Sequence, residues 1–116
     1  MEYVIGGKKY IQRPLVLGQV KQLSKLLKDV VISPGDTPVN IIEILGDKLP
    51  EAMAIVLTPE GQTVKDKNIE EIAREIEFQL DLETTVKVVE DFFVCNQISL
   101  LWKRVQEILK PKAQKN

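Results

Sequence analysis

The chain has 116 residues, of which 44% are hydrophobic and 28% are charged, so its length and composition are those of one globular domain. It has no histidine and a single cysteine, Cys95, which excludes histidine-based catalytic triads, an internal disulfide and the usual structural zinc site. The formal net charge of -1 conceals three blocks, because residues 1–28 carry +5, residues 29–102 carry -10 and residues 103–116 carry +4.

The chain offers no segment that suits export or membrane insertion. Its N-terminus lacks the basic-then-apolar layout of a secretory signal. The longest apolar stretches, around residues 39–45 and 52–57, are far shorter than the roughly 20 residues that a membrane-spanning helix needs. We therefore expect a cytoplasmic protein.

The first twelve residues predict a β-hairpin over about residues 2–12. Tyr, Val and Ile favour strands, and the pair Gly6-Gly7 accepts the positive φ angles of a tight turn. A lone hairpin is marginally stable in water, so we expect it to rest on the helices.

A first helix is predicted after Arg13-Pro14 by apolar residues spaced three and four apart, namely Val20, Leu23, Leu26, Leu27, Val30 and Val31. Three lysines recur at the same spacing on the opposite face, namely Lys21, Lys25 and Lys28. The segment 33–38 then interrupts the helix, with Thr37 or Asp36 suited to cap a second helix and Pro38 suited to its first turn.

Residues 39–45 are apolar nearly all round, which indicates a helix buried on most sides, with a strand as the alternative. Gly46 is placed to end this helix. A short helix is expected from about Leu49 to Leu57, with Pro50 in its first turn. The turn residues 58–61 should close it, and the polar stretch up to Lys67 should be a loop.

The C-terminal half predicts three further helices. Asn68 with Glu71 fits a capping arrangement for a helix whose stripe is Ile69, Ile72, Ala73 and Ile76. Asp81 can cap the next helix, and Asn96 tolerates the left-handed conformation that ends helices. The last helix has apolar positions Ile98, Leu101, Val105, Ile108 and Leu109, and Pro111 stops it.

The elements together predict a mainly α fold, in which an N-terminal β-hairpin is followed by a compact bundle of five to six helices. We assign residues 1–110 to this single domain and residues 111–116 to a polar flexible tail.

Residue types that could support catalysis or cofactor binding do not form a recognisable site. Carboxylates on the helix after Asn68 are interleaved with Arg74, which is the pattern of a solvated face. Gly6-Gly7 lacks the spacing of a phosphate-binding loop. We expect no enzyme activity, no metal and no cofactor.

Two groups of residues could instead bind macromolecules. Aromatic and large apolar side chains dominate binding hot spots, so we name a candidate partner-binding surface on the last two helices, although core packing is the alternative for each residue: Phe92, Phe93, Leu101 and Trp102. The lysine stripe formed by Lys21, Lys25 and Lys28, with Lys8, Lys9 and Arg13, could contact phosphates. No base-reading motif accompanies it and the chain is slightly acidic, so nucleic acid is the weaker alternative.

Two segments resemble a known family. The run from Tyr3 to Tyr10, continued by Arg13-Pro14-Leu15 and Leu17-Gly18-Gln19, is similar to the start of small tail assembly chaperones of long-tailed bacteriophages and prophages. Asp91-Phe92-Phe93, with Asn96 close behind, resembles an element near the end of such proteins. Together the two segments cover about a quarter of the chain.

The resemblance implies a non-enzymatic protein of the host cell cytoplasm. Such a chaperone binds the tape measure protein, keeps it soluble, helps to recruit tail tube protein and is absent from the mature virion. We expect homo-oligomers as well, because regions of opposite charge favour self-association. The alternative functions are another phage structural component, such as a head-to-tail connector or a tail completion subunit, and a small nucleic-acid-binding regulator.

Overall fold

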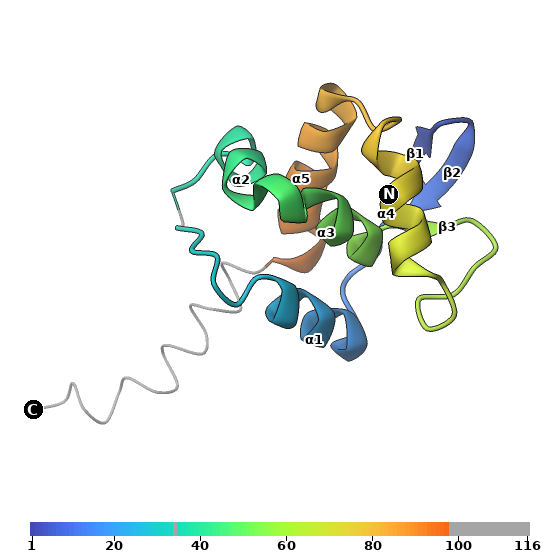
Figure 1. Cartoon of the computed structure of the whole chain (residues 1–116), viewed down its shortest axis with the longest axis horizontal. Helices are drawn as coiled ribbons and strands as arrows, with labels where there is room; N and C mark the ends of the chain where they lie inside the picture. Colours follow the sequence, from blue (N-terminus) through green and yellow to red (C-terminus); the bar gives the residue numbers. More distant parts are fainter. Residues whose placement is uncertain (34, 98–116) are drawn as a thin grey trace, which may run out of the picture.

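The computed structural model describes residues 1–33 and 35–97 (Figure 1). Three short strands, β1 (Glu2–Ile5), β2 (Lys8–Ile11) and β3 (Thr58–Pro59), form an antiparallel sheet in that order. Helices make up most of the rest, namely α1 (Leu17–Leu26), α2 (Pro38–Leu45), the 3₁₀ helix η1 (Gly46–Lys48), α3 (Leu49–Val56), α4 (Ile69–Glu77) and α5 (Leu82–Asn96). The predicted mainly α class is confirmed for these residues.

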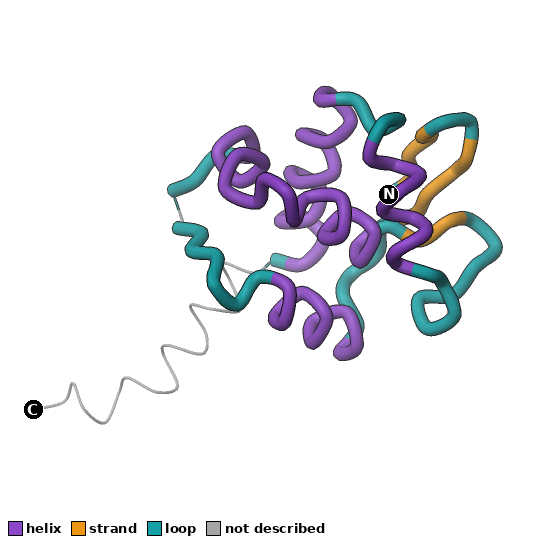
Figure 2. The backbone as a smooth tube through the Cα atoms, in the orientation of Figure 1, coloured by secondary structure: helices purple, strands orange, loops and turns teal. Residues whose placement is uncertain are grey.

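The predicted hairpin is confirmed and lies at one end of the molecule (Figure 2). Gly6 and Gly7 turn the chain with φ angles of 58° and 81°, and the register pairs Tyr3 with Tyr10. Strand side chains alternate between two faces, so Tyr3, Ile5 and Tyr10 enter the core while Val4 points outward. The hairpin therefore contributes its aromatic face to the core.

Residues 58–61 follow the end of α3, as expected, but they begin with a third strand that was not predicted. Thr58 and Pro59 pair with Ile11 and Tyr10 as a third strand, and the Glu60 N–H donates to the Lys9 carbonyl at 2.9 Å. Proline lacks an N–H and is tolerated at the edge of a sheet. A two-residue strand is too short to leave an alternating pattern in the sequence.

The number of separate helices was also predicted too high. Helix α2, η1 and α3 follow one another without an intervening loop over residues 38–56, so the described residues form four helical units. Gly46 does end α2, with a φ of 49°, but the chain continues directly into the 3₁₀ turn. The helix expected over 98–109, its stop at Pro111 and the tail 111–116 lie outside the described residues.

Three predicted helix caps are confirmed. The side chains of Thr37, Asn68 and Asp81 each accept a hydrogen bond from the backbone N–H three residues later, at 3.2, 3.0 and 2.7 Å. The bonds from Thr84 to Asp81 lower the pKa of this carboxyl. Pro38 and Pro50 lie in the first turns of their helices, as expected.

Two helix ends differ from prediction. Helix α1 starts at Leu17 and stops at Leu26, before Val30 and Val31. Helix α5 ends with Asn96 still helical, and Gln97 takes the left-handed conformation with a φ of 48°. The Asn96 side chain is engaged elsewhere, because its amide donates to the Phe92 carbonyl and its oxygen accepts from the Leu15 N–H.

Helix α3 lies at the centre of the molecule (Figure 1). All residues from Ala52 to Pro59 are buried, and α3 packs against both α4 and α1. Helix α2 packs against α5. Helix α2 is less buried than its composition suggested, because Ile41 and Leu45 enter the core while Val39 and Ile44 are exposed.

Candidate protein-binding groove

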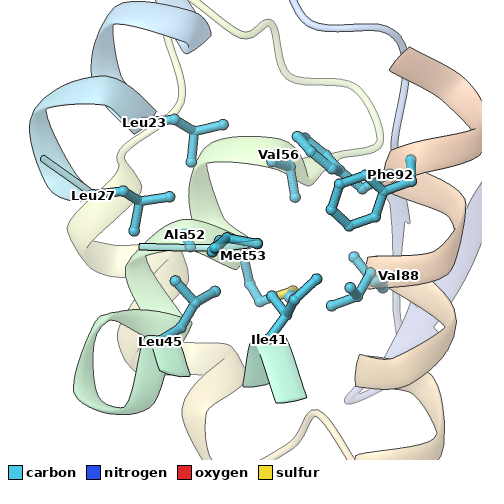
Figure 3. Close-up of a pocket in the computed structure, with 12 residues that line it drawn as sticks. Leu23, Leu27, Ile41, Leu45, Ala52, Met53, Val56, Val88 and Phe92 are labelled. Atoms are coloured by element: carbon cyan, nitrogen blue, oxygen red, sulfur yellow. The ribbon is translucent and has the colours of Figure 1, made fainter. Parts of the chain in front are cut away.

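An apolar groove lies where α1, α2, α3 and α5 meet (Figure 3). Its cavity volume is about 80 Å³. The lining comprises twelve apolar side chains, namely Leu23, Leu27, Ile32, Ile41, Leu45, Ala52, Met53, Val56, Val88, Val89, Phe92 and Phe93. Three stretches that are distant in sequence, 23–32, 41–56 and 88–93, thus contribute side chains to one surface.

The groove has a buried floor and an exposed rim. Its floor is formed by core residues such as Met53 and Val88, which are 4% and 0% exposed. Its rim includes Ile32, in the segment after α1, and Phe93, in the last turns of α5, which are 38% and 37% exposed. The cavity therefore opens to the surface between α1 and α5.

The chemistry of the groove favours an apolar occupant. About 10–15 Å³ is enough space for one water molecule, but an ordered water also needs two to four polar partners. None of the side chains that line the groove has a hydrogen-bonding group other than the weakly accepting Met53 sulfur. An apolar side chain that enters the groove releases water and gains dispersion contacts, which stabilises the bound state.

Both aromatic residues that the sequence analysis named on α5 line this groove. The rings of Phe92 and Phe93 pack edge to face, with centroids 5.4 Å apart and an interplanar angle of 88°. Leu101 and Trp102, the other two named residues, lie outside the described residues. The groove residues of α1, α2 and α3 were not named from the sequence.

Gln19 holds the α1 side of the groove to α3. Its side chain is 3% exposed, its Oε1 accepts from the Val16 N–H at 3.0 Å, and its Nε2 donates to the Ile55 carbonyl at 2.8 Å. The first bond occupies an N–H that helix α1 leaves unpaired at its start. The second bond fixes the position of α1 on the central helix.

The hairpin holds the α5 side of the groove. The Tyr3 hydroxyl donates to Asp91 Oδ2 at 2.7 Å, and Gln12 Nε2 donates to the Tyr3 hydroxyl at 2.8 Å. Burial is the main cause of a raised pKa at Tyr3, and the hydrogen bond to Asp91 adds to it, so the tyrosine stays neutral and donates to the carboxylate. Asp91 precedes the groove residue Phe92, so this network orients that turn of α5.

A buried lysine closes the C-terminal end of α3. Lys67 is 7% exposed, and its Nζ donates to the carbonyls of Ile55 and Leu57 at 2.7 and 2.9 Å and to Thr58 Oγ1 at 3.3 Å. A cation at this position complements the negative end of the helix dipole. Burial lowers the pKa of Lys67 to about 8.

The basic residues do not form one cluster. Lys8 pairs with Glu75 of α4 at 2.6 Å, and Lys9 lies 3.5 Å from Glu2 and 3.6 Å from Glu60. These carboxylates raise the pKa of both lysines. The lysine stripe is separate and exposed, with Lys21 and Lys25 on α1 and Lys28 just after it.

Residues 1–33 and 35–97 contain neither a metal-binding cluster nor a membrane-spanning helix. No group of three or more histidine, cysteine, aspartate or glutamate side chains there could hold a metal ion. No helix in these ranges has the length and hydropathy needed to cross a bilayer.

Comparison of the chain with protein-family models, with curated proteins and with solved structures gave no match. A functional assignment therefore depends on the groove and on the two segments that resemble tail assembly chaperones.

Proposed function

We propose that this protein is a non-enzymatic tail assembly chaperone of a long-tailed phage or prophage, and that its groove binds apolar helical segments of the tape measure protein. In this role it acts in the host cell cytoplasm, keeps the client soluble during tail assembly and is absent from the finished virion.

The observation that supports this function most directly is the open, wholly apolar groove. Amphipathic helices bind such grooves with apolar anchors at positions i, i+3, i+4 and i+7. Helices α1, α2, α3 and α5 supply a rim and a floor for these anchors, and Phe92 and Phe93 supply the aromatic contacts that are common in binding hot spots. A groove without charged residues also suits a client whose apolar side chains would otherwise aggregate.

The two segments that resemble tail assembly chaperones contact each other in the fold. The Tyr3 hydroxyl of the first segment bonds to Asp91 of the second, and the Leu15 N–H donates to Asn96 Oδ1 at 2.7 Å. These contacts hold the turn of α5 that presents Phe92 and Phe93. The resemblance thus covers residues that build and support the groove, which supports the proposal.

Co-expression with a tape measure protein of a long-tailed phage tests the function. We expect the wild-type chain to increase the soluble fraction of the tape measure protein and Phe93→Asp to abolish this increase, because a carboxylate on the rim disfavours apolar contact. Val94→Asp is the matched control, since Val94 is adjacent and 63% exposed but does not line the groove. Equal solubility with and without the wild-type chain would refute the proposal.

A tail connector is the alternative, and the composition of purified particles separates it from a chaperone. Mass spectrometry of assembled tails should detect no copies of this chain if it acts only during assembly. Stoichiometric copies in the particle would instead identify a structural component.

A further inference from the structure

We infer that residues 98–109 of the same chain occupy the groove as an amphipathic helix when no client is bound. In the proposed chaperone, which this inference takes as its starting point, a client segment would have to displace them. Residues 98–109 and the client would thus compete for the groove, and this competition would regulate access to it.

The position of the groove relative to the end of α5 supports this occupant. Phe92 and Phe93 lie in the last two turns of α5, and the helix ends at Asn96. Gln97 adopts the left-handed conformation that ends helices and redirects the chain. The segment begins at the next residue, so its tether is short, the entropic cost of closure is small and its effective concentration at the groove is high.

The sequence of the segment matches the chemistry of the groove. Six of its seven apolar residues recur at helical spacing and would fall on one face of a helix, namely Ile98, Leu101, Trp102, Val105, Ile108 and Leu109, whereas Leu100 would fall on the opposite face. As a helix, twelve residues span about 18 Å, which is enough for three successive turns to insert anchors. An apolar stripe of this length is costly to leave in water.

The charge of the segment also complements that of helices that form the groove. The polar face of the segment contains Lys103 and Arg104, and residues 103–116 together carry +4. Residues 29–102 carry -10, with exposed carboxylates on groove-forming helices such as Glu43 of α2 and Glu90 of α5. A basic polar face therefore complements the α2 and α5 sides of the groove, whereas the α1 side carries the exposed Lys21 and Lys25.

Trp102 gives a direct readout in the full-length chain, because it is the only tryptophan. If the segment occupies the groove, Trp102 emits at shorter wavelength than free tryptophan and is shielded from acrylamide. Ile32→Asp and Phe93→Asp at the rim should shift the emission to longer wavelength and increase quenching. Val94→Asp, outside the groove, should leave both unchanged.

Variants of the segment provide a second test that does not alter the groove. A synthetic peptide of residues 98–110, added in trans, should bind Leu101→Asp/Val105→Asp about tenfold more tightly than the wild type, because the tethered competitor has been removed. Gln106→Asp, off the apolar face, should leave the affinity for the peptide at the wild-type value.

Three results would overturn the inference. These are a solvent-exposed Trp102 in the wild type, a shielded Trp102 that neither rim variant exposes, and shielding that disappears on dilution, which would identify the segment of a second copy as the occupant. The outcome is separable from that of the proposed function. A chain with an exposed Trp102 that still solubilises the tape measure protein would refute only the binding of residues 98–109 in the groove. A shielded Trp102 without chaperone activity would refute only the proposed function.

Discussion

Gln19 and Lys67 are polar side chains in positions that are otherwise apolar, and both bond to the Ile55 carbonyl. A main-chain oxygen at the end of a buried helix needs donors, because an unpaired buried acceptor costs about 1–3 kcal/mol. These two residues therefore join α3, the central helix, to α1 on one side and to the loop before α4 on the other.

Replacement of Gln19 by alanine should destabilise the fold by about 2 kcal/mol, because it removes two hydrogen bonds and leaves the Val16 N–H without this partner. Urea unfolding followed by circular dichroism measures the change. Gln22→Ala is the matched control, since Gln22 lies on the same helix and is exposed, and it should change stability by less than about 0.5 kcal/mol. Equal effects of the two substitutions would contradict the bonding role of Gln19.

Lys67 should make stability depend on pH in the alkaline range. Burial lowers its pKa from 10.5 to about 8 in the folded chain, so between these values the unfolded chain binds more protons and the free energy of unfolding rises with pH. Below about pH 8 both states are protonated and this group adds no pH dependence. Relative to Lys67→Met, the wild type should gain about 1 to 2 kcal/mol between about pH 7 and pH 9.5.

Urea titrations of both proteins across this range give the measurement. The exposed neighbour Lys65 is the control, and Lys65→Met should follow the wild-type curve. Parallel curves for the wild type and Lys67→Met would show that the amine is protonated equally in both states.

Neither Gln19 nor Lys67 could be recognised from the sequence as a buried hydrogen-bonding residue. Gln19 lies in the polar pattern of an amphipathic helix, and Lys67 lies in a stretch that we expected to be a loop. The Ile55 carbonyl lies 36 positions from Gln19, and the carbonyls that Lys67 binds lie 12 and 10 positions from it. Burial of each side chain therefore follows from tertiary packing and not from a local sequence pattern.

Among the elements, the hairpin depends on backbone conformations that only glycine adopts readily. At Gly7 the φ angle is 81° and a Cβ would meet no atom within 4 Å, so Gly7→Ala should cost about 1–2 kcal/mol through backbone strain alone. Thermal unfolding measures the loss. Gly18→Ala in α1, where φ is ordinary and space is also open, should instead stabilise the chain by about 0.5–1 kcal/mol.

Alanine substitutions that shift the melting temperature equally at both glycines would contradict the conformational argument. The conformational argument predicts a lower melting temperature for Gly7→Ala and a higher one for Gly18→Ala, because a Cβ would meet no atom within 4 Å at either position.

Local signals predicted the elements well where a few neighbouring residues decide the outcome. Caps at Thr37, Asn68 and Asp81 use a side chain and an N–H three residues apart, and all three are confirmed. The third strand depends on pairing with residues almost 50 positions away, and no local pattern reveals it. Asn96 was expected to adopt the left-handed conformation, but its bond to the Leu15 N–H, also a distant contact, keeps it helical.

At the scale of the whole molecule, the groove exists because four helices meet without filling the space between them. The sequence indicated Phe92 and Phe93 as a candidate contact surface, because aromatic side chains are common in binding hot spots. It could not indicate Leu23, Ile41 or Met53, because each belongs to an apolar stripe that a closed core would also require. Only the relative placement of α1, α2, α3 and α5 separates groove from core.

The proposed function requires that this groove is the surface that binds the client. The most direct measurement is the set of amide chemical-shift changes in the isotope-labelled chain when an amphipathic segment of the tape measure protein is added. The largest changes should fall on the rim and walls, around Leu23, Ile32 and Phe93, and Phe93→Asp should suppress them. Changes confined to the acidic face of α4 or to the hairpin would contradict the account.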